Sequence, residues 1–225
     1  MCVRLVILSF LVLNTASKPR DSKETIDRAF RRYNIVPQII PVSPPSIITE
    51  IFNDHVANLG DTIPVEGTII KPYTTFTNVH YNRFYTLIAL DDGGSRDRGN
   101  QFVWGCVANI PGPFIRRGDT LAPYVAPNPI PGKGAHRYMT FIYLQRRRIS
   151  ITTDLVASVS KNIRNFNITE FVLRLKLGDP IAGTFFLSRQ SLPKPTCQKP
   201  SCQYSVPKCN YDTIGVDVCC QGGCI

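Results

Sequence analysis

The cysteines of this sequence are spaced in a way that indicates either disulfide bonds or a metal site. Six of the eight cysteines follow residue 196, in a segment with few apolar side chains. Such a segment cannot fold around a core of its own, so three disulfides are expected to hold it together. The sequence does not fix the pairing. Zinc binding is the alternative, but the segment lacks histidine and a repeated Cys-x-x-Cys spacing. The disulfide candidates are Cys197, Cys202, Cys209, Cys219, Cys220 and Cys224.

Other residues that could carry out catalysis or bind a metal lack the necessary partners. Cys106 lies in an apolar run without a neighbouring base, which indicates a buried thiol rather than a nucleophile. His55 and His80 have no Cys, Asp or Glu at the spacing of metal ligands. The sequence contains no nucleophile elbow, zinc-protease motif or phosphate-binding glycine-lysine loop. We therefore expect a protein without enzymatic activity, cofactor or metal.

The first 17 residues indicate the compartment. Arg4 is followed by an apolar run, 5–13, and then by small residues up to Ser17, which is the pattern of a cleaved secretory signal peptide. The apolar run is about half as long as the roughly 20 residues that a membrane-spanning helix needs. We therefore expect a secreted, extracellular protein with no nucleic-acid partner. The arginines at 116–117 and 146–148 predict weak attraction to anionic membrane surfaces, with solvated turns as the alternative.

Strands must position most of the remaining residues. Segments rich in β-branched and aromatic side chains, bounded by Gly, Pro, Asn or Asp, are predicted strands at 62–70, 83–90, 102–110, 137–145 and 183–187. No long helical pattern lies between them, which disfavours a doubly wound α/β sheet. The prolines within 37–45 exclude a helix and predict an extended segment there. An all-β core is expected.

A short helix is predicted before the first strand. Asp21 and Glu24 have the spacing of a capping box, and apolar residues recur up to Tyr33 with helical spacing. Asn34 can end this helix in the left-handed conformation.

Asn167 allows two interpretations. Together with Glu170 it has the spacing of a helix start, although the alternating apolar residues that follow also fit a strand. Asn167, Ile168 and Thr169 also form the triplet for N-glycosylation. The side chain of an N-cap must stay close to its own backbone, so the cap and the glycan compete. Asn167 is therefore a candidate for either role.

Composition changes after the last predicted strand. Prolines and lysines within 192–200 indicate a stiff linker. The sequence thus divides into a signal peptide, 1–17, a main domain, 18–191, and a linker with a cysteine-rich tail, 192–225.

Several segments of the main domain resemble one protein family. GAHRY, Gly134 to Tyr138, resembles the Gly-x-His-Arg-aromatic motif of the phosphatidylethanolamine-binding protein family. Further matching segments occur in the family's order between residues 29 and 186: AFRRYNIVPQII, VANLGD, YTLIALDD, VANIPG and DPIAGTFF. The resemblance implies a mainly β fold of two antiparallel sheets with a few peripheral helices. It also implies a small surface pocket for phospholipid head groups, phosphorylated small molecules or phosphorylated peptides.

The resemblance also indicates where the pocket lies. A phosphoryl group needs converging N–H and O–H donors in a concave, partly dry site. His136 and Tyr138 match two such donors of the family. The carboxylate of Asp91 can hold the imidazole protonated and oriented.

This sequence departs from the family pattern around that pocket. Trp104 stands where the family has its second pocket histidine, and Gly105 stands at the neighbouring aromatic position. The indole could pack over a ligand, with packing in the core as the alternative. Asn128 replaces a frequent glycine, and the loop 91–96 lacks the family's prolines. The candidate ligand-binding residues are Asp91, Trp104, Asn128, His136 and Tyr138.

Two functions follow from these observations. The first is a secreted, non-catalytic binding protein with an anion pocket for phosphorylated or phospholipid head groups, which the departures could have made degenerate. The alternative is a protease inhibitor or protein-interaction module that contacts a protease or another extracellular protein through the cysteine-rich tail. The same tail also fits a stapled terminus that resists proteolysis.

Overall fold

The computed structural model describes residues 22–93, 101–132, 134–161 and 166–190. The predicted signal peptide and the six tail cysteines lie outside these residues. Within the described parts of the chain, no helix is both long enough and apolar enough to cross a membrane.

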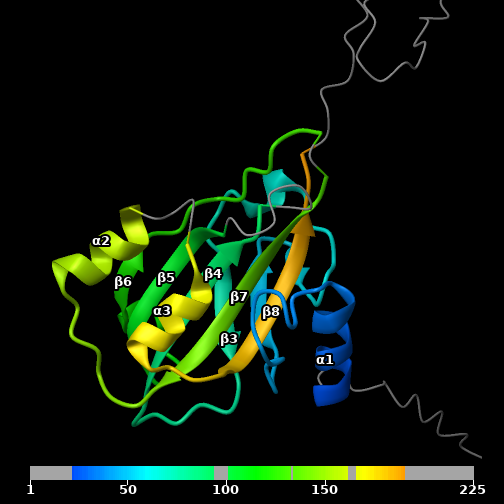
Figure 1. Cartoon of the computed structure of the whole chain (residues 1–225). Coiled ribbons are helices and arrows are strands. Elements are labelled where there is room, and N and C mark those ends of the chain that lie inside the picture. The colour runs from blue at the N-terminus through cyan, green and yellow to red at the C-terminus, as the bar shows by residue number, and fades with distance from the viewer. Residues whose placement is uncertain (1–21, 94–100, 133, 162–165, 191–225) are drawn as a thin grey trace, which may run out of the picture. The chain divides into compact units, whose positions relative to one another are not determined.

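The larger sheet contains five antiparallel strands in the order β6-β5-β4-β7-β8 (Figure 1). Four of them confirm predicted strands, namely β4 (Phe84–Asp91), β5 (Phe102–Pro111), β7 (His136–Gln145) and β8 (Pro180–Ser188). The edge strand β6 (Asp119–Ala122) was not predicted, because four residues are too few to show an alternating pattern.

A smaller sheet packs against the larger one. It contains β1 (Ile48–Phe52), β2 (His55–Ala57) and β3 (Tyr73–Phe76) in the order β2-β1-β3, and both strand pairs are antiparallel. The structure is therefore mainly β with two antiparallel sheets, as the sequence predicted.

Three helices accompany the sheets: α1 (Lys23–Arg32), α2 (Thr153–Lys161) and α3 (Ile168–Leu175). In Figure 1, α1 lies beside β8 and α2 lies near β6. Two 3-10 turns complete the described elements, η1 (Val65–Thr68) and η2 (Ile115–Arg117).

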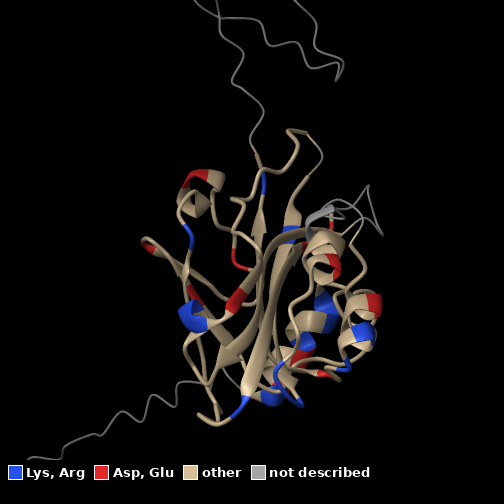
Figure 2. Cartoon of the chain, turned by 90° about the vertical axis from the view of Figure 1, so that its left-hand side faces the viewer, with Lys and Arg blue, Asp and Glu red and all other residues tan. Residues whose placement is uncertain are grey.

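The core has two layers, because side chains alternate across the larger sheet. On β4, Ile88 and Leu90 face a cluster that includes Phe30 of α1 and Phe171 of α3. Tyr85 and Leu87 face a second cluster, which includes the side chains of the smaller sheet. Charged residues lie mainly on helices and loops, and most of the strand ribbon is uncharged (Figure 2).

Cys106 is buried, as expected, and it is a free thiol. Burial raises the pKa of this thiol to about 12, which keeps it protonated and unreactive.

The first helix begins one residue later than the capping box implied. Ser22, not Asp21, is the N-cap, and its hydroxyl accepts a hydrogen bond from the backbone N–H of Thr25. Asp27 and Arg31 form an ion pair along the helix at 2.9 Å. Asn34 has φ of 54°, which confirms the predicted left-handed residue after the helix.

Two predicted extended segments were wrong. Residues 62–70 contain the turn η1, and Ile69 and Ile70 are exposed there. Apolar residue types alone therefore do not indicate a strand in this segment. Residues 36–39 form turns in which the N–H of Ile39 bonds to the carbonyl of Ile35.

The helix interpretation of Asn167 is confirmed. Its side-chain oxygen accepts hydrogen bonds from the backbone N–H groups of Thr169 and Glu170 at the start of α3. Glycosylation of Asn167 stays a prediction.

Candidate functional site

The pairing of β4 with β7 brings three of the predicted pocket residues together. Asp91, the last residue of β4, lies directly opposite Tyr138. His136 and Tyr138 are two residues apart on β7, so their side chains leave the same face of the sheet. Their rings are stacked, with 6.3 Å between centroids and 18° between planes. All three residues are buried.

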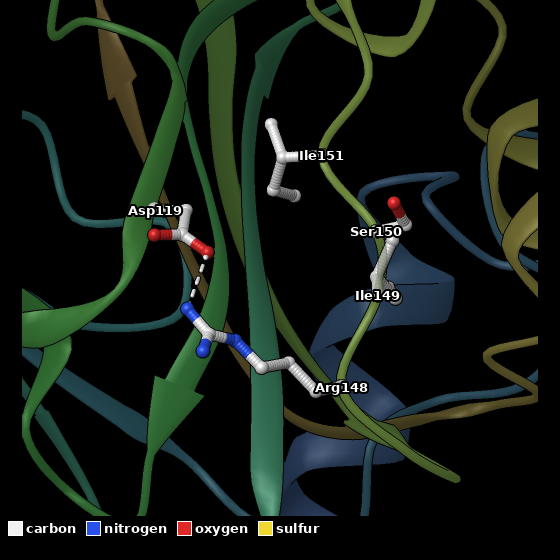
Figure 3. Close-up of a pocket in the computed structure, with 5 residues that line it drawn as sticks. All are labelled: Asp119, Arg148, Ile149, Ser150 and Ile151. Atoms are coloured by element: carbon white, nitrogen blue, oxygen red, sulfur yellow. Dashed lines mark hydrogen bonds and ion pairs between the residues drawn. The ribbon is translucent and has the colours of Figure 1, made fainter.

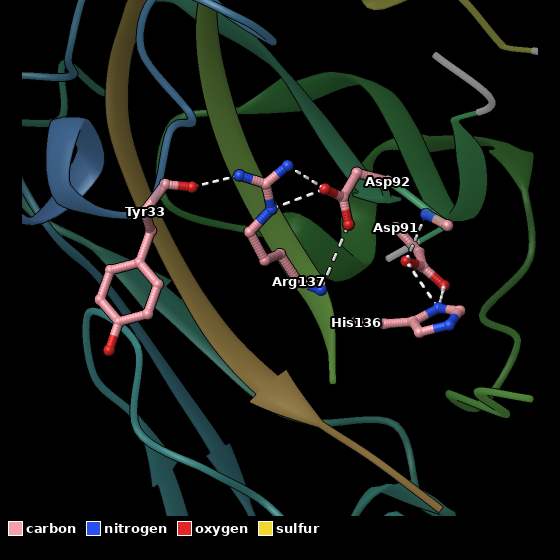
Figure 4. Close-up of polar contacts among 6 residues, drawn as sticks. Tyr33, Asp91, Asp92, His136 and Arg137 are labelled. Carbon is pink, nitrogen blue, oxygen red and sulfur yellow. Dashed lines mark hydrogen bonds and ion pairs between the residues drawn. The ribbon is translucent and has the colours of Figure 1, made fainter. Parts of the chain in front are cut away.

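Asp91 holds the ring of His136. One carboxylate oxygen lies 2.9 Å and the other 3.2 Å from Nδ1 of His136 (Figure 4). A carboxylate only accepts hydrogen bonds, so Nδ1 carries a proton. Asp91 also accepts a hydrogen bond from the backbone N–H of Gly93 at 2.9 Å. The carboxylate therefore fixes the orientation of the imidazole and stabilises a positive charge on it.

The phenol of Tyr138 is held neutral beside this pair. Burial raises the pKa of Tyr138 well above its usual value, and the nearby carboxylate of Asp91 raises it further. A contact with the backbone of Asn128 acts in the opposite direction. Asn128 itself is exposed, so its described role at Tyr138 involves the main chain. The hydroxyl keeps its proton at physiological pH and hydrogen-bonds to the side chain of Asp91.

The arginine of the GAHRY motif has a different role from the histidine. Figure 4 shows His136 and Arg137 leaving β7 in opposite directions. Nε of Arg137 donates to the carboxylate of Asp92 at 2.6 Å, and the guanidinium also contacts the backbone carbonyl of Tyr33. This buried ion pair ties the ends of β4 and β7 to the turn after α1. Arg137 therefore stabilises the strand ends that carry Asp91 and His136, from the opposite face of the sheet.

Sequence reasoning missed this role of Asp92. From the sequence, no role was assigned to the second carboxylate of Asp91-Asp92. The signal was available in the sequence, because neighbouring residues of an extended chain point to opposite faces, which places Asp92 on the face opposite Asp91. Asp92 is buried and pairs with the residue next to His136, just as Asp91 pairs with His136.

Trp104 occupies an irregular position on β5. The register shifts between Ala89 and Leu90, which pair with Gly105 and Val103 respectively, so Trp104 is the extra residue of a bulge. The indole is buried and packs edge-on against Tyr138 and Tyr124, with centroids 6.4 Å and 5.6 Å away. Trp104 is thus part of the core, which confirms the packing alternative. It also contacts Tyr138, the residue that stacks on His136.

A hollow of about 530 Å³ lies at the opposite end of the sheet, where Arg148 and Asp119 form an exposed ion pair at 3.4 Å (Figure 3). A connected hydrogen-bond network adjoins it, because the side chain of Asn109 donates to Asp119 and to the backbone carbonyl of Ile149. Gln145 accepts from Thr86 and from the backbone of Asn109, and it donates to the side chain of Asn109. The amide and carbonyl groups of this network bond to one another, so we interpret it as structural.

Curated proteins are similar to this chain in sequence, while no protein-family model matches it. The 26 kDa secreted antigen of Toxocara canis is 31% identical over 69% of this chain, and the match spans 61% of the antigen. A Drosophila melanogaster protein that carries the name odorant-binding protein A5 is 25% identical over 83% of this chain and 90% of its own length.

Solved structures share the fold. A carboxypeptidase Y inhibitor, solved in complex with its cognate proteinase, superposes with a TM-score of 0.63 at 18% identity, over 75% of this chain and 96% of the inhibitor. The phosphatidylethanolamine-binding protein of Plasmodium vivax superposes with a TM-score of 0.53 at 16% identity, over 72% of this chain and 96% of its own. These likenesses establish the fold, and the GAHRY motif lies on the strand β7 of that fold. The chain therefore has the fold of the phosphatidylethanolamine-binding proteins, the family that its sequence resembles.

Proposed function

We propose that the chain is a non-catalytic binding protein that holds a phosphoryl group at Asp91, His136 and Tyr138. The observation that carries this proposal is the 2.9 Å contact between Asp91 and Nδ1 of His136, both of which are buried. A carboxylate that orients an imidazole and favours its charged form makes a strong donor for an anion. The phosphatidylethanolamine-binding protein of Plasmodium vivax, which shares this fold, is named for such a ligand.

The arrangement is better suited to bind a phosphoryl group than to bind a cation. Asp91 hydrogen-bonds to His136 and Asp92 forms an ion pair with Arg137, so both carboxylates are already engaged and neither is open to a cation. The neutral hydroxyl of Tyr138 lies beside the imidazole, and its O–H, which hydrogen-bonds to Asp91, can turn to donate to a ligand. Hydrogen bonds from these donors to a phosphoryl group are charge-assisted, and such bonds are about twice as strong as hydrogen bonds between neutral groups.

We further propose that the protein acts outside the cell. The amino-terminal segment has the pattern of a secretory signal, and the Toxocara canis relative is named as a secreted antigen. An extracellular phosphoryl ligand would be a phospholipid head group or a soluble phosphorylated molecule.

Calorimetric titration with O-phosphorylethanolamine tests the binding site. The wild-type chain should give saturable heat, and His136→Ala should lose it. The matched control is His80→Ala, which removes an exposed histidine and should bind like the wild type. Equal binding by all three proteins would place the ligand elsewhere, and no binding to the wild type would reject the pocket. Titration with phosphatidylethanolamine vesicles then separates a lipid ligand from a soluble one.

Inhibition of a protease is a second candidate function, because the inhibitor of carboxypeptidase Y has the same fold. We propose the cysteine-rich tail, residues 192–225, as the contact region in that case. The full chain and a chain that ends at Leu192 should then differ in inhibition of a panel of proteases. Equal inhibition by both would remove the tail from this role.

A further inference from the structure

A second cavity lies on the face of the larger sheet that is turned toward the smaller sheet. Its volume is about 970 Å³, and its walls come from β1, β3, β4, β5, β6 and the turn η2. Trp104 is one of the lining residues, whereas Asp91, His136 and Tyr138 are not. The indole therefore contacts both Tyr138 and the cavity. The cavity is large enough for a small organic ligand.

The space exists because two small residues face each other on neighbouring strands. Gly105 pairs with Ala89, and both line the cavity. A Cβ atom added to Gly105 would meet only the Cβ of Ala89, at 3.7 Å. At Gly118, by contrast, an added Cβ would come within 2.6 Å of Val107. Gly105 is thus not required by close packing, and its missing side chain leaves the cavity open.

Two buried polar groups in the lining lack hydrogen-bond partners among the described residues. They are Oε2 of Glu50 and Nε1 of Trp104, on residues that are only 2% and 5% exposed. The other oxygen of Glu50 accepts from Thr74 at the long distance of 3.5 Å, and the hydroxyl of Thr140 is close enough to lower the pKa of the carboxyl group. Buried polar groups are nearly always hydrogen-bonded, and leaving one unpaired typically destabilises a protein by about 1–3 kcal/mol. An acceptor and a donor therefore line the same cavity without partners.

Tyr124 connects these two groups. Its ring packs against Trp104, with 5.6 Å between centroids, and Glu50 is close enough to influence the charge of its phenol. The hydroxyl of Tyr124 already donates to the backbone carbonyl of Thr68. Tyr124 therefore brings apolar surface to the site, while its hydroxyl is engaged elsewhere.

Charge at the two ends of the cavity selects a neutral ligand. Lys71, Arg116 and Arg117 are exposed and line the opening, where they would repel a cation. Glu50 is buried at the inner end, where its carboxyl group would disfavour an anion. A hydroxyl group meets both needs, since its oxygen can accept from the indole N–H and its proton can be donated to the carboxylate.

We propose that this cavity binds a small apolar alcohol, with its hydroxyl group at Glu50 and Trp104 and its hydrocarbon part against Leu87, Ala89 and Tyr124. This site is separate from the phosphoryl site and does not depend on it.

Decanol, its methyl ether and decanoate are matched probes for this proposal. The ether keeps an acceptor oxygen but cannot donate, and decanoate carries a charge. Trp104 is the one tryptophan of the sequence, so its fluorescence reports directly on the cavity, and calorimetry gives the affinity. At pH 8 the wild-type chain should bind decanol about tenfold more tightly than the ether, because the ether would leave the carboxylate of Glu50 unpaired.

Substitutions at the cavity should change this preference. In Glu50→Gln the side-chain amide can donate to an ether oxygen, so the preference for decanol should shrink to about threefold or less. Gly105→Leu should fill the cavity and abolish binding of decanol, and an unchanged circular dichroism spectrum and cooperative melting would show that it folds. Gly105→Ala, which adds one methyl group where space is available, should weaken binding only slightly.

A variant of the phosphoryl site provides the control. His136→Ala should bind decanol like the wild type, so loss of phosphoryl binding and loss of alcohol binding can be told apart. The proposal is overturned if decanol gives no saturable signal, if decanol and the ether bind equally to the wild type, or if decanoate binds more tightly than decanol.

Discussion

Trp104 separates two buried polar regions that differ in how their ionisable groups are partnered. On one side, the carboxylate of Asp91 lies 2.9 Å from Nδ1 of His136. On the other side, Oε2 of Glu50 has no hydrogen-bond partner in the described part of the chain. A paired carboxylate and imidazole stabilise each other's charge, whereas an isolated buried carboxylate favours its neutral form. The first region is therefore suited to a charged phosphoryl group and the second to a neutral hydroxyl.

The largest expected effect concerns the paired side. Arg137→Ala removes the guanidinium that neutralises the buried carboxylate of Asp92. We expect the free energy of unfolding, measured in urea, to fall by about 3–5 kcal/mol, because breaking one partner of a buried ion pair leaves a charge in the interior. The control is Arg148→Ala, which breaks an exposed pair with Asp119 and should cost less than about 1 kcal/mol. Similar losses in the free energy of unfolding for both variants would show that the buried pair is no more important for stability than the exposed one.

The second prediction concerns the unpaired side and its dependence on pH. Burial raises the pKa of Glu50 from 4.5 to about 7, although nearby threonine hydroxyls oppose the shift. Between these values the folded chain retains a proton that the unfolded chain has released. The contribution of Glu50 to stability is therefore fully present below pH 4.5 and is lost as the pH rises to about 7, by on the order of 3 kcal/mol.

Glu50→Gln isolates this contribution, because the amide does not titrate. The difference in the free energy of unfolding between the variant and the wild type should shift in favour of the variant as the pH rises from 4.5 to 8. Urea unfolding at several pH values measures this difference. A difference that stays constant with pH would show that the carboxyl group of Glu50 keeps an ordinary pKa.

The third prediction tests the carboxylate that holds the imidazole. Asp91→Asn keeps the size of the side chain but removes the charge that stabilises the imidazolium. Affinity for O-phosphorylethanolamine should fall by roughly tenfold to a hundredfold, and affinity for decanol should not change. Calorimetry with both ligands measures the two affinities. If both fall together, the two regions are coupled and Trp104 does not separate them.

The smallest expected effect concerns Tyr138. Tyr138→Phe removes one neutral donor and keeps the ring that stacks on Phe186. Phosphoryl affinity should fall by about fivefold, which corresponds to about 1 kcal/mol for a neutral hydrogen bond. An unchanged affinity would mean that the hydroxyl does not contact the ligand.

The same comparison explains how much of the site the sequence could predict. Asp91, His136 and Tyr138 were found because the family motif fixes two of them on one strand, and a strand places residues two apart on one face. Glu50 was missed, although its strand β1 carries a signal. Ile48 and Phe52, two residues before and after Glu50, are buried, so alternation places Glu50 on the inward face too. Its burial still depends on the packing of one sheet against another, which the sequence does not show directly.

The fold was predicted where strands are long. The segments that became β4, β5 and β7 contain eight to ten residues rich in β-branched and aromatic side chains. The strands of the smaller sheet contain three to five residues, which is too short for a periodic signal. The helix α2 was missed because the apolar face of its nine residues consists of only three large side chains, Leu155, Val156 and Val159, which is too few for a periodic signal.

The phosphoryl site is tested most directly by nuclear magnetic resonance of the histidine side chains. The sequence has three histidines, so a long-range proton–nitrogen spectrum can distinguish each imidazole. Added O-phosphorylethanolamine should shift the ring nitrogens of His136 in a saturable manner and leave those of His55 and His80 unchanged. Resonances of His136 that do not move at saturating ligand would contradict the account.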